Sequence, residues 1–407
     1  MVRDKQLSCN KSGVYRPFSN RGLLSGTVIA NPKGFGFVAL DKGGKDLRLS
    51  SQQMKLAFHG DKVKVRLLNR KLDAEIVEVT ETVSTLVGRL HIDHQRSYVI
   101  VDDKRIKHEI QIVKLLDGCK DNQVVVIEVL TSPTLEKNAT GKVTSILGNY
   151  LDEGVEVDSA IHRHQIPSTF GEKALQESAN LPTKVIPRDK KNRVDITNLE
   201  LVTIDGEDSR DFDDAVYAIP SVNGWKLIVA IADVSHYVKE GTELDSESLE
   251  RGNSVYFPHR VVPMLPEAIS NGLCSLNPKV ERLCMACEME IDSLGSLLNY
   301  KFYPAVMLSH ARLTYTEVNE MLENKESPLR KKYSRIKENV DYLYGLYQTL
   351  RISRQKRGVM DFDRIESQIL FDDKGKIENI VARKRNDAHK LIEECMLMAN
   401  QAAAKYL

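Results

Sequence analysis

The sequence has no hydrophobic run of the roughly 18 residues that a membrane-spanning helix requires. Its first residues, Met1 to Lys5, also lack the apolar segment of a secretory signal peptide. Only six cysteines are scattered over 407 residues, which is typical of a cytosolic protein with reduced thiols. These absences predict a cytoplasmic protein without a membrane partner.

One cysteine pair, Cys284 and Cys287, has the spacing of two zinc ligands. A structural zinc site needs about four ligands, and no second pair follows nearby. The pair lies in an apolar run from Leu283 to Ile291 that is typical of a strand. We therefore expect buried structural thiols rather than a metal site.

Charge is unevenly distributed, although the formal net charge is only +1. Residues 1–70 contain 14 Lys or Arg against 4 Asp, which gives +10, whereas carboxylates cluster later. A basic entrance followed by an acidic centre fits a protein that gathers a polyanion and delivers it to metal ions. Charge alone leaves open the alternative of a solvated basic face and a flexible leader.

The pattern of apolar residues indicates several domains. Residues 1–21 are expected to form an irregular leader. Short alternating segments, separated by turn residues, recur over 22–82 and more loosely over 83–149, which predicts two five-stranded barrels of the OB or cold-shock type. Residues 150–198 resemble a polar connector. Strands alternate with helices over 199–407, so the predicted class is an α+β multidomain protein that ends in a mixed α/β domain.

The strongest chemical signal is the run DGEDSRDFDD at residues 205–214. It holds six carboxylates and a single cation, Arg210, and apolar strand-like segments flank it. Carboxylates packed between buried strands repel one another, and a bound hard cation is the usual remedy, because Mg²⁺ takes oxygen ligands and commonly contacts substrate phosphates. An EF-hand loop fits poorly, since its glycine and its last glutamate are not matched.

The segment KGFGF at residues 33–37 is the main signal in the first barrel. Phe35 and Phe37 are two apart in a strand and point to one face. Bases stack on such rings while a cation such as Lys33 meets the phosphate. Two core phenylalanines in a small barrel are the alternative. The segment resembles a cold-shock domain, but residues 46–50 lack the ring expected on the next strand, which predicts weak stacking.

The acidic run closely resembles the signature of the ribonuclease II/ribonuclease R exoribonuclease family, nearer to its ribonuclease R branch. The resemblance extends from about residue 22 to the end of the chain. Supporting blocks follow in the family's order, namely AIADVS at 230–235, RGNSVYFP at 251–258, PMLP at 263–266, LCSLNP at 273–278 and RNDAHKLIEECM at 385–396.

The resemblance implies a 3′→5′ exoribonuclease that hydrolyses single-stranded RNA processively to nucleoside 5′-monophosphates. Two Mg²⁺ ions would act on the attacking and leaving oxygens. The matching positions would be both catalytic residues and metal ligands, namely Asp205, Asp211, Asp213 and Asp214. A monomer acting on single-stranded or structured RNA is expected.

The resemblance also implies RNA contacts outside the metal site. Tyr256 and Phe362 match the aromatic pair that grips the 3′-terminal bases, although on the residues alone each would be a core side chain. Tyr315 and Glu394 match positions near the terminal ribose, where contact with the 2′-OH favours RNA over DNA.

The family pattern continues beyond Glu394 with a motif like HFTSPIRRY, whose arginine contacts the scissile phosphate, and with an RNA-binding barrel. Neither occurs in these 407 residues, so we expect a truncated catalytic domain. A second hypothesis is therefore a catalytically inactive RNA-binding remnant. A third, an unrelated two-metal phosphoesterase, leaves the tandem barrels unexplained. Truncation predicts that the last helix lacks a cover for its apolar positions, which are Leu391, Ile392, Cys395, Met396 and Ala399.

Overall fold

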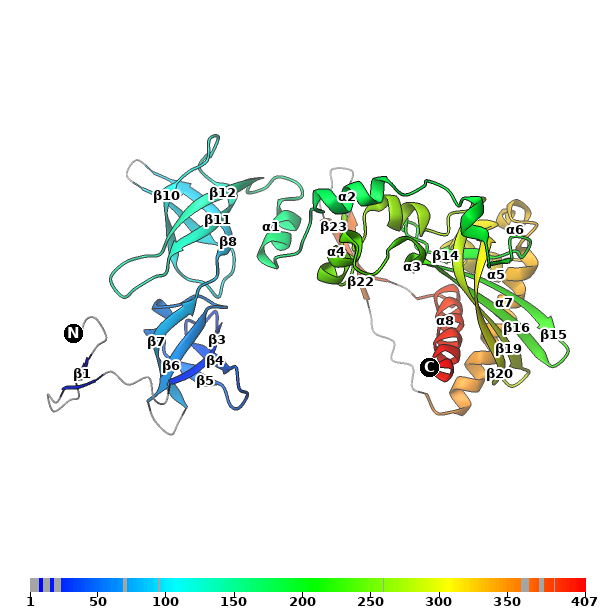
Figure 1. Cartoon of the computed structure of the whole chain (residues 1–407), viewed down its shortest axis with the longest axis horizontal. Helices are drawn as coiled ribbons and strands as arrows, with labels where there is room; N and C mark the ends of the chain where they lie inside the picture. The colour runs from blue at the N-terminus through cyan, green and yellow to red at the C-terminus, as the bar shows by residue number, and fades with distance from the viewer. Residues whose placement is uncertain are drawn as a thin grey trace. The chain divides into compact units, whose positions relative to one another are not determined.

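The computed structural model describes residues 7–9, 15–17, 23–68, 72–93, 96–258, 260–359, 366–372, 377–383 and 385–407. The chain divides into two compact units, Met1–Ile166 and Pro167–Leu407 (Figure 1). No helix in the described ranges has both the length and the apolar character needed to cross a bilayer. Part of the expected irregular leader is ordered, because β1 (Leu7–Cys9) pairs antiparallel with β2 (Tyr15–Pro17).

The first unit contains two closed five-stranded barrels, which confirms the barrels expected from the sequence. Buried and exposed residues alternate along strands such as Leu23–Ala30 and Glu109–Lys114, so alternate side chains fill each barrel. The strand Gln123–Thr131 is buried on both faces, because Val124 and Val126 also pack against Val155. The first barrel has the order β3-β4-β5-β7-β6. Its strands are Leu23–Ala30 (β3), Gly36–Leu40 (β4), Leu47–Leu49 (β5), Lys62–Leu67 (β6) and Asp73–Glu81 (β7).

The second barrel has the order β10-β12-β11-β8-β9. Its strands are Thr85–Ile92 (β8), Ser97–Val101 (β9), Glu109–Lys114 (β10), Gln123–Thr131 (β11) and Thr140–Asn149 (β12). Helix α1 (Val155–Arg163) packs against β8 and β12. The stretch expected to be a connector, 150–198, is thus divided between the two units.

A loop of the first barrel is built into the second. Phe58 is fully buried in the hydrophobic core of the second barrel and makes an edge-to-face contact with His108, at 5.1 Å between ring centroids. Asp61 is also buried, and its carboxylate accepts hydrogen bonds from the backbone N–H groups of Phe58 and Val83. The two barrels therefore share one apolar anchor and one buried polar junction.

The second unit is organised around a seven-stranded sheet with the order β13-β20-β19-β16-β15-β14-β21. Neighbouring strands are antiparallel except at the two edges, where β13 runs parallel to β20 and β21 runs parallel to β14. The strands are Val194–Asp195 (β13), Val202–Asp205 (β14), Asp214–Ser221 (β15), Gly224–Ala232 (β16), Glu281–Asp292 (β19), Leu297–Leu308 (β20) and Ala311–Thr314 (β21).

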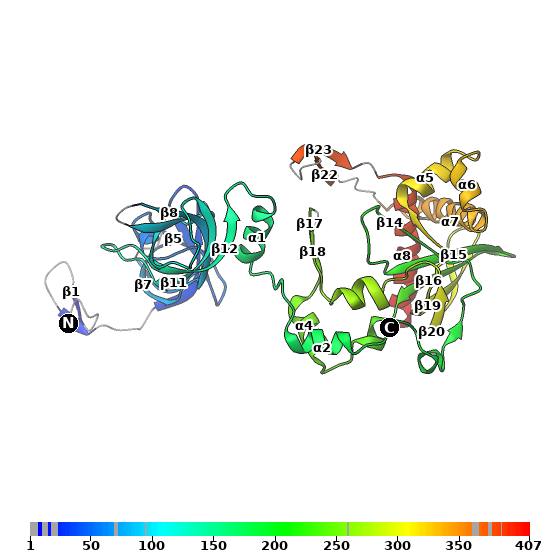
Figure 2. The same ribbon diagram turned by 90° about the horizontal axis from the view of Figure 1, so that it is seen from above.

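Helices cover both faces of this sheet. One face packs on α5 (Tyr315–Glu323), α7 (Lys337–Lys356) and α8 (Asp387–Tyr406), and α8 contacts the strands β16, β19 and β20 (Figure 2). The other face packs on smaller helices, which are α2 (Glu172–Ala179), α3 (Val234–Tyr237), α4 (Glu243–Arg251) and η3 (Ala268–Leu273).

The remaining elements lie outside the seven-stranded sheet. They are the 3₁₀ turns η1 (Gln53–Lys55) and η2 (Pro187–Lys190), the helix α6 (Pro328–Lys332), and the hairpins β17–β18 (Val255–Phe257, Arg260–Val262) and β22–β23 (Glu366–Phe371, Ile377–Arg383).

Cys284 and Cys287 are buried thiols on β19, as expected from the sequence. Three residues apart on a strand, they point to opposite faces, and each joins the hydrophobic core of its own face. They cannot chelate one ion together.

The last helix does not leave its apolar face uncovered, so that expectation is wrong. Leu391, Ile392 and Cys395 are buried against α5, α7 and the strands β16 and β19. Asn386 caps the helix, because its side-chain oxygen accepts a hydrogen bond from the backbone N–H of His389, at 3.2 Å. Elements within these 407 residues therefore supply the cover.

This packing predicts different costs for two substitutions on α8. Leu391→Ala removes a fully buried side chain and should lower the free energy of unfolding by about 2–5 kcal/mol. Leu397→Ala, at a position 40% exposed, should cost much less. Fluorescence of Trp225, the single tryptophan, reports unfolding of the second unit in urea. Equal midpoints for the two variants would contradict the packing.

Candidate active site

The acidic run lies where two strands of the large sheet meet. Asp205 is the last residue of β14 and Asp214 is the first residue of β15, so the loop between them carries Asp211 and Asp213. The parallel strand β21 brings Thr314 beside Asp205. The four predicted catalytic aspartates therefore gather at one end of the sheet.

Burial and mutual repulsion dominate the electrostatics of this loop. Burial, followed by the carboxylates of Asp205 and Asp213, raises the pKa of Asp214 to about 6. The pKa values of Asp205 and Asp213 are also raised, first by burial and further by the charge of Asp211. Each aspartate thus makes ionisation of its neighbours less favourable, which is the condition that a bound cation relieves.

Two side chains from other segments fix the loop through its backbone. The guanidinium of Arg312, on β21, donates hydrogen bonds to the carbonyl oxygens of Glu207 and Ser209, at 2.6 and 3.3 Å. From the segment before β19, the Ser275 hydroxyl donates to the carbonyl oxygen of Arg210 and accepts from the N–H of Phe212, at 2.9 and 3.0 Å.

Sequence reasoning missed both of these supports. Arg210, the single cation of the run, has an exposed side chain and forms no ion pair with the described residues. Burial raises the pKa of Asp205, and the charge of the Arg312 guanidinium offsets a small part of that rise. Both Arg312 and Ser275 lie in family-like segments, but nothing in their spacing announces a contact with the acidic run.

Tyr256 lies at the edge of the acidic loop. Its hydroxyl, on the hairpin strand β17, donates a hydrogen bond to a carboxylate oxygen of Asp211 at 2.5 Å. This bond, followed by burial of the hydroxyl, raises the pKa of Tyr256. The side chain as a whole is 64% exposed, so it is not the core residue that its apolar neighbours would suggest. A ring open to solvent therefore stands beside the aspartates.

Tyr315 and Glu394 occupy the helical side of the same region. Tyr315 begins α5 directly after Thr314 and stacks on His389 of α8, with ring centroids 4.0 Å apart. Glu394 is buried, and its carboxylate accepts a hydrogen bond from Arg354 of α7 at 2.5 Å. Phe362 lies outside the described residues.

The donor set suits a hard cation but is not preformed as a cage. All the acidic ligands offer oxygen, which Mg²⁺ prefers. Across the described part of the chain, however, no three His, Cys, Asp or Glu side chains are grouped as a metal site. The contacts of Asp211 explain part of this, because its carboxylate is turned toward Tyr256 and the Ser209 hydroxyl.

The predicted RNA-binding residues of the first barrel also lie together. Phe35 and Phe37 form an edge-to-face pair with centroids 5.7 Å apart. Arg48 on β5 pairs with Phe37 where the family-like ring is missing. A groove of about 700 Å³ adjoins Phe35 between the two barrels of the first unit. Its charged lining is mainly basic, namely Lys33, Lys55, Arg105, Lys107 and Lys137 against Glu109 and Glu136.

Family models match most of the chain. A model described as "RNB domain" matches residues 193–407, "Cold shock domain" matches residues 98–171, and "Ribonuclease B OB domain" matches residues 26–79. These matches agree with two barrels followed by a mixed α/β catalytic-type domain, and they confirm the predicted fold class.

Curated relatives carry the name ribonuclease R. The protein from Escherichia coli (strain K12) is 44% identical over 414 residues, covering 100% of this chain and 51% of the relative. The protein from Acidithiobacillus ferrooxidans is 40% identical over 370 residues, covering 89% of this chain and 84% of the relative. The chain spans about half the length of several curated relatives that it matches.

Solved structures agree with this assignment. Mycoplasma genitalium RNase R in complex with ribose-methylated single-stranded RNA is 27% identical to this chain. It superposes with a TM-score of 0.86, covering 94% of this chain and 62% of that one. The acidic loop, the tandem barrels and these similarities lead to one conclusion: the chain belongs to the RNB family, as a member of the ribonuclease R group.

Proposed function

We propose that this chain degrades single-stranded RNA from its 3′ end and releases nucleoside 5′-monophosphates. The convergence of Asp205, Asp211, Asp213 and Asp214 at one end of the sheet carries the proposal. Membership of the ribonuclease R group supports it, as does the relative whose structure holds single-stranded RNA. We further expect a monomeric, cytoplasmic enzyme.

The four aspartates would hold two Mg²⁺ ions, which supply Lewis-acid stabilisation of the attacking and leaving oxygens. Hydrolysis adds the oxygen of water to phosphorus and breaks the bond from phosphorus to the 3′ oxygen of the preceding nucleotide. A proton from that water ends on the released 3′ oxygen. Arg312 and Ser275 would keep the loop in place while its carboxylates bind.

Selection of RNA would come from the groups around the loop. The exposed ring of Tyr256 is available to stack on a base, which is a sequence-tolerant contact. Tyr315 stands next to the strand end that carries Asp205 and is suited to a ribose contact. The Glu394 carboxylate would reach a 2′-OH only if its pair with Arg354 opened.

Replacement of one aspartate tests the proposed chemistry. On a 5′-labelled single-stranded oligoribonucleotide with Mg²⁺, the wild-type chain should produce a ladder that shortens from the 3′ end. Asp213→Asn should slow it roughly 10²–10³-fold, as for loss of one transition-state stabiliser. Asp208→Asn removes the same charge from a position in the run that is not one of the four proposed ligands, and it should stay near wild type.

Each alternative has its own result in this assay. RNA binding by the wild-type chain without any ladder would identify the inactive RNA-binding protein instead. Internal fragments in place of a 3′ ladder would point to an unrelated phosphoesterase. A ladder retained at full rate by Asp213→Asn would remove that aspartate from the mechanism.

The raised pKa of Asp214 predicts a pH-dependent stability in the presence of a chelator. The folded state holds its proton up to about pH 6, whereas the unfolded state loses it near pH 4. Stability should therefore fall as pH rises from about 4 to above 6, by an amount on the order of 2–3 kcal/mol. Asp214→Asn should flatten this fall when unfolding is followed by Trp225 fluorescence.

Addition of Mg²⁺ at pH 7.5 should raise the melting temperature of the wild-type second unit, because a cation offsets the repulsion between ionised carboxylates. The rise should be smaller in Asp214→Asn. A variant with the wild-type pH profile and the wild-type response to Mg²⁺ would show that Asp214 is neither the strained acid nor a ligand.

The aromatic pair of the first barrel predicts a loss of RNA affinity. Phe35→Ala and Phe37→Ala should each weaken binding of a single-stranded oligoribonucleotide by about 1–3 kcal/mol per lost base stack. Fluorescence anisotropy with Mg²⁺ omitted separates binding from cleavage. Leu24→Ala, an exposed apolar position on β3, is the matched control. Affinities equal to that of the control would leave the two rings as ordinary barrel residues.

A further inference from the structure

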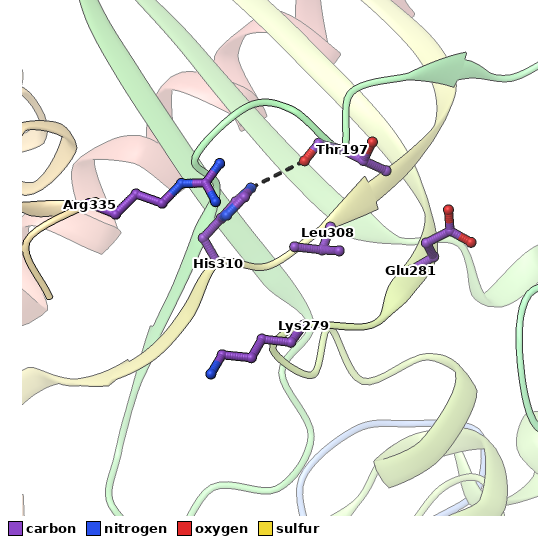
Figure 3. A pocket seen from close by; sticks show the side chains of 6 residues that line it. All are labelled: Thr197, Lys279, Glu281, Leu308, His310 and Arg335. Carbon is purple, nitrogen blue, oxygen red and sulfur yellow. Dashed lines mark hydrogen bonds between the residues drawn. The ribbon is translucent and has the colours of Figure 1, made fainter.

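A second pocket opens in the second unit, away from the acidic loop. It has a volume of about 520 Å³ and is lined by Thr197, Lys279, Glu281, Leu308, His310 and Arg335 (Figure 3). The N–H of His310 donates to the carbonyl oxygen of Leu201, just before β14 begins. Asp205 ends the same strand four residues later, about 13 Å along at the usual rise. The pocket and the acidic loop thus lie toward opposite ends of β14.

Two cationic side chains, Lys279 and Arg335, line this pocket together with His310, and the three come from separate segments. In Figure 3, the Arg335 side chain extends toward the His310 ring, whereas Lys279 lies on the other side of His310 with its ammonium group pointing away from that guanidinium. The His310 ring is oriented by a contact of its Nε2 atom with the Thr197 carbonyl oxygen, at 3.2 Å. Because a carbonyl oxygen can only accept, Nε2 is the donor in this contact, and the contact does not use Nδ1.

The acidic groups nearby are already engaged. Glu281 pairs with Lys190 at 2.6 Å. Glu200 accepts from Nε of Arg335 at 3.2 Å, which leaves the terminal amino groups of that guanidinium unengaged by the described residues. The Lys279 ammonium forms no ion pair with any described carboxylate. The pocket therefore keeps an excess of positive charge.

The backbone conformation of Lys279 is a second observation that points to a ligand-binding position. Its φ of 63° lies in the left-handed region, which is unfavourable for a residue with a long side chain. The strained turn is tied to the sheet, since the N–H of Lys279 donates to the carbonyl oxygen of Ser309 at 2.8 Å. Strain of this kind concentrates at ligand-binding positions. In this turn it sets the backbone position from which the Lys279 side chain extends.

We propose that this pocket binds a phosphate group of a nucleotide, through Lys279 and the terminal amino groups of Arg335. Such a phosphate is carried either by a mononucleotide or by a phosphodiester of an RNA strand. A planar guanidinium and a point-charge ammonium together match a phosphate. The cavity volume suits a mononucleotide-sized ligand. The assignment of the phosphate to a nucleotide rests on the proposed function, whereas the phosphate site itself does not.

Binding of adenosine 5′-monophosphate, measured by calorimetry with a chelator present, tests the first source. Lys279→Gln and Arg335→Gln should each weaken this binding at least tenfold, and adenosine without the phosphate should not bind. Lys405→Gln removes an exposed lysine of α8 that does not line the pocket, and it should match the wild type.

A single-stranded oligonucleotide tests the second source. If the pocket takes a phosphodiester, the wild type should not bind the mononucleotide. Each pocket variant should then lower the slope of log affinity against log salt by about 0.7, the value for one lost contact on a single strand. No change in either ligand for both pocket variants would overturn the proposal. Asp213→Asn should keep pocket binding, so failure of the proposed nuclease activity remains a separate result.

Discussion

Carboxylates that are partly buried close together repel one another. The second unit holds such a group in place despite this repulsion. The loop from Asp205 to Asp214 is held by its backbone rather than by its charges. Arg312 donates hydrogen bonds to two carbonyl oxygens of the loop. Ser275 forms hydrogen bonds with the backbone of two further loop residues. The carboxylates stay available because none of them is consumed by these supports. The β21 strand and the segment before β19 are therefore as much a part of the site as the aspartates.

The aromatic and acidic groups around the loop are engaged with one another in this state. Tyr256 donates a hydrogen bond to Asp211, and Glu394 accepts one from Arg354. Each of these contacts joins a group that is proposed to meet RNA or metal with a protein partner. Ligand binding would thus exchange partners rather than fill an empty space. The cost of the exchange falls on α7 and on the β17–β18 hairpin, which hold the two internal partners.

Much of this organisation could be predicted from the sequence, and the failures have physical causes. Alternation of apolar residues correctly indicated both barrels. The acidic run correctly marked the end of β14, because a dense group of carboxylates between two strand patterns is seldom a plain solvated loop. The roles of Arg312 and Ser275 could not be predicted, since each acts through backbone atoms about 65 to 105 residues away. The cover of α8 was misjudged for a similar reason: its apolar stripe was visible, but the partners on α5, α7 and β19 come from distant segments.

The burial of Phe58 in the second barrel has a consequence for how the first unit can be divided. A cut between the repeats at residues 82–83 would strip one barrel of a core side chain and leave Asp61 of the other without the Val83 N–H. The second barrel therefore does not begin at a single position in the chain, because the 56–61 loop, which precedes it in sequence, is part of its structure. If the second barrel were moved into another protein, the 56–61 loop would have to move with it, because Phe58 fills part of its core. The two barrels are therefore expected to unfold together, as a single module.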